Sequence, residues 1–512
     1  MKKGLIKAST AIAVFLLLVV PAAWAQKSDV PSSLTGFDKF ANEILAEWKV
    51  PGLAVSIVKD GKVIYAEGFG YKDVKNGLKV TPHTVFAIGS CTKAFTATTM
   101  AILVDEGKLD WDKPVRTYLP SFKLLDSVAS EQMTPRDLAC HRSGLPRHDR
   151  VWYLSPLGRQ QLFERLQYLE PSRGFRAAYQ YQNLMFMTAG YLVERIVGIS
   201  WEEFAGKRIL EPLEMKETNF TVTDSQKAPD FAFPYQEIKG KVEQIPFCNI
   251  DALGPAGSIN SNVSDMSKWV LLNLNEGRYG EKADQRILAE ATLAQIHSPQ
   301  IVVPGSMKYD ELFYASYGLG WRITAYRGHP LVYHGGAIDG FSAMVSFMPR
   351  DNIGIVLLNN LEDAPINSIL AYNIYDRMLG LNQVNWGQRV REDIVKSRQD
   401  TEKTKKEREK DRKLNTQLSH PLDDFVGSYE HPGYGILTIE KEGNGLKAKF
   451  NTMTFALTHY HYDIFEMTNP LIDFDQLLSF YTDAKGSIGT AGVKFEPAAK
   501  DIVFLRIPAK DK

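Results

Sequence analysis

Ser90 and Lys93 are the residues whose types and spacing point most directly to chemistry. They open an apolar segment that continues to Val104 and precedes Gly107, which predicts a buried helix with a glycine stop. Residues three apart share one face of a helix, so the Lys93 ammonium can reach the Ser90 hydroxyl. A serine becomes a nucleophile when a neighbour takes its proton, which a desolvated lysine can do. The alternative is a helix that Ser90 caps while Lys93 extends to water.

Two later motifs could complete a hydrolase site around this serine. Tyr181 and Asn183 are two apart, and in an extended segment this spacing puts both side chains on one side. His334-Gly335-Gly336-Ala337 ends a predicted strand, where glycines let the backbone approach a ligand and the next N–H can point into a site. Taken singly, each motif is also explained without a function, as a core tyrosine with a turn asparagine and as a glycine turn.

In this order, the Ser-x-x-Lys, Tyr-x-Asn and His-x-Gly motifs resemble those of the serine β-lactamase and penicillin-binding protein superfamily. The closest similarity is to the class C β-lactamase-like branch, which also contains esterases and D-amino-acid peptidases. The resemblance covers residues 30 to about 380. Five further segments look typical of that branch: Phe86-Ala87-Ile88-Gly89, Trp111-Asp112-Lys113-Pro114-Val115, Cys140-His141-Arg142-Ser143-Gly144-Leu145, Pro255-Ala256-Gly257-Ser258 and Tyr317-Gly318-Leu319-Gly320-Trp321.

The resemblance implies a role for each residue that handles protons. Ser90 would be the acylated nucleophile and Lys93 its proton-handling partner. Tyr181 would be the general base or a proton shuttle, although Tyr179 could compete for that role and Tyr181 could be only a structural hydrogen-bond donor. The implied reaction is acyl transfer through an acyl-enzyme that water releases, with no cofactor and no metal.

The same resemblance implies how a substrate is held. Asn183 would bind the acyl side chain, and the strand residues His334, Gly335 and Gly336 would contact substrate. The backbone N–H groups of Ser90 and Ala337 would form the oxyanion hole, which stabilises charge that develops only in the transition state. Gln182, which replaces a common serine of the asparagine motif, should point away.

The strand motif departs from the pattern of typical β-lactamases, which carry Lys-Thr-Gly where this chain has His334-Gly335-Gly336. In that family the lysine and threonine bind the carboxylate of penicillins and of peptide C-termini. Histidine is mostly neutral at pH 7 and glycine has no hydroxyl, so we expect weaker carboxylate binding. Esters or amides are therefore the favoured substrates. The alternatives are a D,D-carboxypeptidase, D-amino-acid peptidase or β-lactamase, and a non-catalytic sensor or binding module.

The order of the predicted elements indicates how these motifs meet. An amphipathic helix near residues 34–48 precedes strands at 53–58 and 63–69, which an Asp-Gly turn joins into a hairpin. Helices and loops then alternate to about residue 300, before strands at 320–326, 331–334, 342–348 and 353–358. Strands at both ends predict one antiparallel sheet closed by the two termini of a domain. The resemblance makes this an α/β (α+β) fold of the β-lactamase/transpeptidase type, with helices flanking the sheet and an all-helical subdomain.

Composition divides the chain into four parts. Residues 1–25 combine basic, apolar and small-residue segments ending in Ala23-Trp24-Ala25, which predicts a cleaved signal peptide and export to a periplasm or the cell exterior. The catalytic domain is predicted at 30–384. Residues 385–420 contain an almost wholly charged run and are predicted to be an exposed helix or linker. Short alternating strands at 421–510 predict a small all-β barrel or sandwich domain.

Charge and ligand-forming residues limit the partners. Sixty basic residues balance sixty acidic residues, so no nucleic acid is expected. Cys91, Cys140 and Cys248 are odd in number and indicate no disulfide framework. His459 and His461 could bind a metal from one strand face, but without acidic or cysteine partners nearby we expect surface histidines. We expect a small-molecule or peptide substrate and association with the cell envelope, and the oligomeric state is left open.

Overall fold

A nine-stranded antiparallel sheet organises the N-terminal part of the protein, as seen in a computed structural model that describes residues 31–305 and 307–508. The predicted signal peptide at 1–25 lies outside the described residues. In spatial order the strands are β10 (Ile301–Val302), β11 (Ser316–Tyr317), β12 (Arg322–Tyr326), β13 (His329–Ile338), β14 (Phe341–Met348), β15 (Ile353–Asn359), β1 (Gly52–Lys59), β2 (Lys62–Asp73) and β3 (Leu78–Lys79).

The two ends of the domain meet in the middle of this sheet. β1 pairs with β15 in the register Leu53↔Asn359, which confirms the predicted closure by both termini. The two strands are apolar almost throughout because helices cover both of their faces. The β1–β2 hairpin turns through Asp60 and Gly61, both with positive φ, as a type I′ turn requires.

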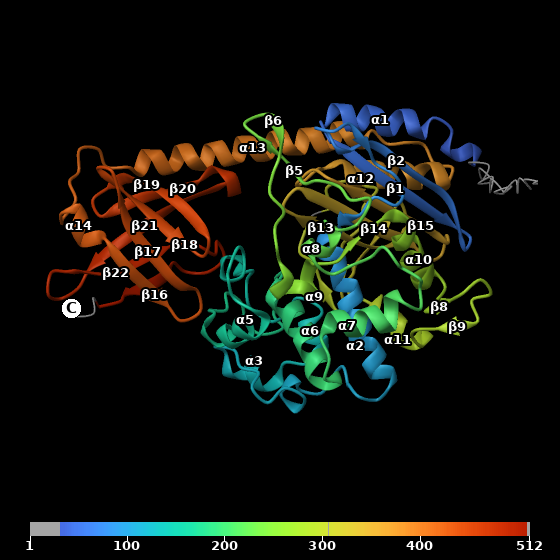
Figure 1. The fold of residues 1–512 in the computed structure, drawn as a ribbon, viewed down its shortest axis with the longest axis horizontal. Coiled ribbons are helices and arrows are strands. Elements are labelled where there is room, and N and C mark those ends of the chain that lie inside the picture. The colour runs from blue at the N-terminus through green and yellow to red at the C-terminus, as the bar shows by residue number, and fades with distance from the viewer. Residues whose placement is uncertain (1–30, 306, 509–512) are drawn as a thin grey trace, which may run out of the picture.

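Helices form the two covering layers. α1 (Phe37–Glu47) and α12 (Ile366–Met378) pack on one face of the sheet, and α10 (Val263–Leu274) and α2 (Thr92–Asp105) pack on the other. Below the second face lies a mostly helical region (Figure 1). Its helices are α3 (Ser127–Gln132), α4 (Pro135–Leu138), α5 (Arg159–Arg165), α6 (Asn183–Val197), α7 (Trp201–Ala205), α8 (Val222–Ser225), α9 (Gly254–Gly257) and α11 (Glu290–Ile296). Three two-stranded sheets accompany them: β4 (Phe86–Ala87) pairs with β7 (Asn260–Ser261), β5 (Tyr235–Ile238) with β6 (Lys241–Gln244), and β8 (Arg278–Tyr279) with β9 (Gln285–Arg286).

The helix predicted after Ser90 is α2, and it is buried on all sides. A 3₁₀ turn at Gly89–Cys91 precedes it and places Ser90 at its start. Gly107 follows the helix with φ of +68°, the left-handed conformation that glycine adopts without strain. An apolar helix without a polar face belongs in a protein core, so the position of Ser90 is set by packing.

A closed eight-stranded barrel forms the C-terminal part, which decides between the predicted barrel and sandwich. Its strands are β16 (Gly427–His431), β17 (Gly435–Glu442), β18 (Gly445–Phe450), β19 (Met453–His461), β20 (Ile464–Asn469), β21 (Phe474–Thr482), β22 (Ile488–Val493) and β23 (Ile502–Arg506), preceded by the short helix α14 (Leu422–Phe425). Pairing of Tyr429 with Arg506 closes the ring. Aromatic side chains fill the interior, including stacked Tyr434 and Phe495.

The histidines of β19 have separate partners. His459 Nε2 lies 2.8 Å from the Tyr462 carbonyl oxygen, and His461 Nδ1 accepts from the Lys413 N–H at 3.2 Å. Across residues 31–305 and 307–508, no group of three or more metal-ligating side chains could hold an ion.

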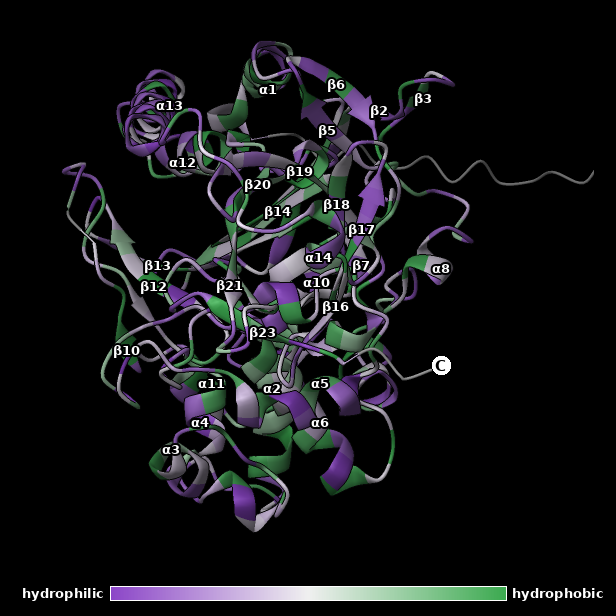
Figure 2. Ribbon diagram, turned by 90° about the vertical axis from the view of Figure 1, so that its left-hand side faces the viewer, coloured by the Kyte–Doolittle hydropathy of each residue, from purple (hydrophilic) through white to green (hydrophobic). Residues whose placement is uncertain are grey.

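The charged segment before the barrel is the helix α13 (Trp386–Asp411), which spans about 39 Å at 1.5 Å per residue. It joins the two parts of the protein (Figure 1), and it is mostly hydrophilic along its length (Figure 2). Trp386 anchors its first turn in the core, and Arg408 pairs with Glu466 and Asp475 of the barrel. Among the described residues, no helix has the length and apolar character needed to cross a bilayer.

Candidate active site

Ser90 Oγ lies at the meeting point of two hydrogen-bonding side chains. Lys93 Nζ is 2.9 Å from it, and Tyr181 Oη donates to it at 2.7 Å. Lys93 Nζ also donates to the Ala256 carbonyl oxygen at 2.7 Å, which fixes the amine from the far side. The structure therefore brings together the serine, lysine and tyrosine of the first two sequence motifs.

Burial gives Lys93 and Tyr181 different proton affinities. Lys93 is fully buried, and burial, reinforced by the Arg147 guanidinium, holds its pKa well below the usual range for lysine. Burial raises the pKa of Tyr181, so its phenol stays protonated at neutral pH. A neutral amine can accept the serine proton, whereas a protonated phenol can only donate or relay one.

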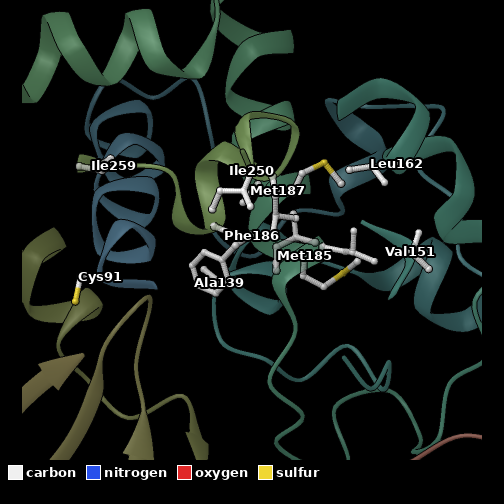
Figure 3. Close-up of a cluster of buried hydrophobic side chains, with 14 of the residues drawn as sticks. Cys91, Ala139, Val151, Leu162, Met185, Phe186, Met187, Ile250 and Ile259 are labelled. Atoms are coloured by element: carbon white, nitrogen blue, oxygen red, sulfur yellow. The ribbon is translucent and has the colours of Figure 1, made fainter. Parts of the chain in front are cut away.

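Apolar side chains of α6 pack in the core behind the site. Phe186 lies beside Ala139, whereas Met185 and Met187 point toward Val151 and Leu162 (Figure 3). The Lys93 Nζ lies 5.5 Å from the centroid of the Phe186 ring. Cys91 is buried near the same region and its thiol donates to the His334 carbonyl oxygen, a packing position.

Two glycines bring β13 against the Ser90 turn. A Cβ on Gly336 would lie 1.9 Å from the Ile88 carbonyl oxygen and 3.2 Å from the Ser90 N. A Cβ on Gly89 would lie 2.7 Å from the Ala337 N. No side chain fits between these backbones, so the N atoms of Ser90 and Ala337 share one small region beside the serine hydroxyl. Two such N–H groups can stabilise an oxyanion.

This close approach predicts that Gly336→Ala lowers turnover of an ester by about 10²- to 10³-fold, the effect of losing an oxyanion donor. The new methyl must displace either the Ser90 turn or β13, and both carry the donors. Steady-state hydrolysis measures the effect. Gly335→Ala is the matched control, because a Cβ there would meet only the Ala343 carbonyl oxygen, at 3.8 Å. An equal loss in both variants would contradict this explanation.

His334 is a buried neutral residue rather than an exposed one. Its side chain is 2 % exposed, and its two ring nitrogens lie 2.6 Å from the Gly335 carbonyl oxygen and 2.9 Å from the Tyr317 hydroxyl. The carbonyl can only accept, so Nδ1 carries the proton and Nε2 accepts from Tyr317. Burial, with Lys93 nearby, lowers the pKa of His334 to about 3. The substrate contact expected from this motif is therefore available only to the backbone of β13.

Buried neutral histidines predict that the protein loses stability in acid. Burial lowers the pKa of His334 to about 3 and holds that of His141 well below its usual 6.5. Below pH 6.5 these histidines become protonated in the unfolded chain but stay neutral in the folded chain. Each of them therefore lowers the free energy of unfolding by about 1.4 kcal/mol for each unit by which the pH falls. Thermal melts from pH 7 to pH 4 should show this slope.

The test compares His334→Gln with wild type. His334→Gln should flatten the dependence of the melting temperature on pH, because it removes a buried histidine that stays neutral in the folded protein. Equal slopes in wild type and His334→Gln would contradict the assignment of a neutral His334.

Asn183 is the first residue of α6 and points toward a neighbouring loop. Its Nδ2 donates to Asp149 Oδ1 at 3.1 Å. Gln182 is fully buried, caps α6 by accepting from the Leu184 N–H, and donates to the Pro146 carbonyl oxygen. Both amides therefore connect α6 to residues 146–149.

Two arginines near the site have no signal in the sequence motifs. The Arg147 guanidinium carbon lies 5.0 Å from the centroid of the Tyr181 ring, and its Nε pairs with Asp149. Arg322 Nη2 donates to Tyr179 Oη at 3.1 Å, so Tyr179 is engaged away from Ser90. Tyr181, not Tyr179, is the tyrosine on the serine. Both arginines reach the site through the tertiary fold, which a motif search cannot reveal.

Comparisons with known proteins agree with this geometry. A family model described as Beta-lactamase matches residues 37–376, and one described as a domain of unknown function (DUF3471) matches residues 411–506. The chain is 28% identical to "Unguisins hydrolase ungD'" of Aspergillus campestris (strain IBT 28561) over 499 residues, covering 91% of this chain and 90% of that protein. It is 27% identical to "Protein flp" of Staphylococcus aureus (strain N315) over 346 residues, covering 65% of this chain and 64% of that protein.

A solved structure has a similar fold over nearly the whole chain. It is the octameric penicillin-binding protein homologue from Pyrococcus abyssi, with a TM-score of 0.60 and 24% identity. The alignment covers 92% of this chain and 99% of that chain. The similarity therefore extends over both the catalytic part and the barrel.

Proposed function

This chain belongs to the β-lactamase family and is a serine hydrolase, and we propose that it cleaves esters or amides through an acyl-enzyme on Ser90. One observation carries the proposal: Ser90 Oγ is within hydrogen-bond distance of both Lys93 Nζ, at 2.9 Å, and Tyr181 Oη, at 2.7 Å. A serine held between a low-pKa amine and a phenol is prepared to lose its proton.

In the proposed first step, the neutral Lys93 amine takes the Ser90 proton as Oγ bonds to the substrate carbonyl carbon. The carbonyl oxygen becomes an oxyanion, held by the N–H groups of Ser90 and Ala337. When the bond to the leaving group breaks, Lys93 returns the proton to that group by way of the Tyr181 hydroxyl. Water then repeats the attack on the acyl-enzyme and releases the acid, which restores Ser90.

Lys93 is the principal base in this proposal and Tyr181 the proton relay. The supporting observation is the opposite shift of their pKa values, lowered for Lys93 and raised for Tyr181. A base must be unprotonated at the working pH, and Lys93 meets this condition more readily than Tyr181.

A fluorophosphonate tests the proposed nucleophile. We expect stoichiometric labelling of the purified wild type and none of Ser90→Ala. Ser121→Ala, which removes an exposed serine elsewhere, is the matched control and should label like wild type. Unchanged labelling of Ser90→Ala would rule out the assignment.

Esters or amides without a recognised carboxylate are the proposed substrate class. His334 is neutral and buried, so the strand that carries it presents no cation to a carboxylate. The relative from Aspergillus campestris is named as a hydrolase of unguisins, which supports a hydrolytic reaction for this chain. A panel of p-nitrophenyl esters, D-amino-acid amides and nitrocefin should show ester or amide turnover above nitrocefin turnover.

Peptidase or β-lactamase activity of the D,D-carboxypeptidase type is the second candidate, and Arg147 favours it. Its side chain is 53% exposed, beside Tyr181, and could hold a substrate carboxylate in place of the absent lysine. Rapid acylation by a fluorescent penicillin would support this candidate, and slow or absent acylation would count against it.

We also propose that the protein is exported after cleavage behind Ala25. The support is the basic, apolar and small-residue pattern of residues 1–25. Sequencing the N-terminus of the protein recovered outside the cytoplasm would test it, with Gln26 as the expected first residue.

A further inference from the structure

We infer that the C-terminal barrel is part of the catalytic apparatus, because its residues Glu496 and Tyr434 position a loop that contacts the active site. We name residues 143–154 the bridging loop. The inference rests on the proposed function, since it concerns the same Ser90 site. Glu496 and Tyr434 are positioning residues in it, because they act through the bridging loop and touch neither Ser90 nor Lys93.

The barrel holds the bridging loop at a buried histidine. The His148 N–H donates to Glu496 Oε2 at 2.8 Å, and Glu496 is only 4 % exposed. The His148 ring lies between the Tyr434 hydroxyl, 2.7 Å from Nδ1, and the Glu170 carbonyl oxygen, 2.9 Å from Nε2. The carbonyl can only accept, so Nε2 carries the proton and Tyr434 donates to Nδ1. The backbone N–H and both ring nitrogens of His148 are therefore engaged, and the barrel engages the N–H and Nδ1.

The conformation of His148 needs these contacts. Its φ is +49°, in the left-handed region that a side chain other than glycine rarely occupies. Such a conformation persists only where the surroundings hold it. Without Glu496, the buried His148 N–H would lose its acceptor, and a more relaxed path of the bridging loop would be favoured.

A second barrel contact clamps the other end of the bridging loop. Asn451, in the β18–β19 turn, donates through Nδ2 to the carbonyl oxygens of Arg150 and Tyr153, at 3.0 and 3.1 Å. The Thr452 N–H donates to the Leu154 carbonyl oxygen at 3.2 Å. The barrel thus binds the backbone of this loop at His148 and again at 150–154.

Side chains of the same loop contact the active site. The Arg147 guanidinium lies over the Tyr181 ring, and Asp149 accepts from Asn183 at 3.1 Å. The Tyr153 hydroxyl donates to Asp339 Oδ2 at 2.6 Å, two residues beyond the oxyanion residue Ala337. Residues 147 and 149 face the site while residue 148 between them faces the barrel. A shift at His148 must therefore move Arg147 and Asp149.

The chemistry of Glu496 provides a sharp test. Its carboxylate accepts from His148 and from the Ala498 N–H at 3.0 Å. The single amide oxygen of glutamine can still accept from the His148 N–H, and only the bond from the Ala498 N–H is lost to the amide NH₂. Glu496→Gln should therefore keep the bridging loop in place, whereas Glu496→Ala cannot. Tyr434→Phe removes the donor to His148 while keeping the ring that stacks on Phe495.

The experiment measures kcat and KM for a p-nitrophenyl ester, the rate of fluorophosphonate labelling, and the melting temperature, all on full-length protein. We expect Glu496→Ala and Tyr434→Phe to lower kcat/KM by about 10- to 100-fold, the usual effect of misplaced substrate contacts. Labelling should change far less, because the small reagent requires only the Ser90 surroundings. Glu496→Gln should restore kcat/KM, and the exposed barrel variant Asp501→Ala should match wild type.

Three other outcomes are distinguishable, and each contradicts a different part of the inference or of the proposed function. Unchanged kcat/KM in both Glu496→Ala and Tyr434→Phe would show that the barrel does not position the site. Equal losses of ester hydrolysis and labelling, without rescue by Glu496→Gln, would show a contact that only maintains the fold. Absence of labelling in wild type would instead refute the proposed nucleophile, so the two failures are distinguishable.

Discussion

Replacing Ser90 by alanine lowers ester turnover by roughly 10⁴- to 10⁶-fold, the loss typical of a removed serine nucleophile. No acyl-enzyme can form without Oγ, and only the oxyanion site and binding remain to assist attack by water. Steady-state hydrolysis by purified Ser90→Ala, at protein concentrations high enough to see the residual rate, measures the effect.

The fold should survive this change, because the Ser90 side chain is small and, among the described residues, its hydroxyl is hydrogen-bonded only to Lys93 and Tyr181. Melting temperatures of Ser90→Ala and the Ser121→Ala control should therefore be close to that of wild type. Turnover by Ser90→Ala within tenfold of wild type would mean that another group is the nucleophile.

The second large effect is expected at Lys93. Lys93→Met keeps the length and burial of the side chain but removes the base, so kcat should fall by about 10²- to 10⁴-fold. Tyr181→Phe should lose less, because the neutral amine can still accept the Ser90 proton. Comparing the two variants by kcat on one ester decides between the two candidate bases. A larger loss in Tyr181→Phe than in Lys93→Met would make the tyrosine the principal base.

The pH dependence of kcat/KM in wild type also tests whether Lys93 is the base. The amine must be neutral to accept a proton, so kcat/KM should rise as pH increases through the pKa of Lys93. Burial holds that pKa well below 10.5, so the rise should be complete well below pH 10.5. Lys93→Met should lack this limb of the profile.

The sequence was sufficient to predict features that depend on local spacing. The three-residue interval from Ser90 to Lys93 fits one face of a helix, and α2 forms there. Asp60-Gly61 predicted the hairpin because only a few residue types accept positive φ at both turn positions. Runs of apolar residues at both ends of the domain predicted the strands that pair as β1 and β15, since such strands must be covered on both faces.

Features that depend on contacts between residues far apart in the chain could not be predicted from a single sequence. Tyr179 and Tyr181 lie on the same side of an extended segment, and it is the fold that places Tyr181 against Ser90 and Tyr179 against Arg322. The alternation of residues after 421 predicted strands but not whether they close, because closure depends on Tyr429 meeting Arg506. His148 and Glu496 are almost 350 residues apart, so no local pattern could indicate that the barrel contacts the bridging loop.

Neutrality of the strand histidine was predicted from its ordinary pKa, but its burial was not. A histidine in the position of a substrate-binding lysine suggested a residue open to the ligand. In the structure His334 is buried instead, with its Nε2 against the Tyr317 hydroxyl. Specificity in this site must then come from the backbone of β13 and from the loops, including Arg147.

Trapping the acyl-enzyme is the most direct test of the central claim. Wild type is mixed with a p-nitrophenyl ester, quenched in acid during turnover, digested and analysed by mass spectrometry. We predict that the peptide containing Ser90 gains the mass of the acyl group and that Ser90→Ala gains none. Turnover of the ester with an acyl group on another residue, or with no adduct at all under conditions that preserve acyl-serine, would contradict the account.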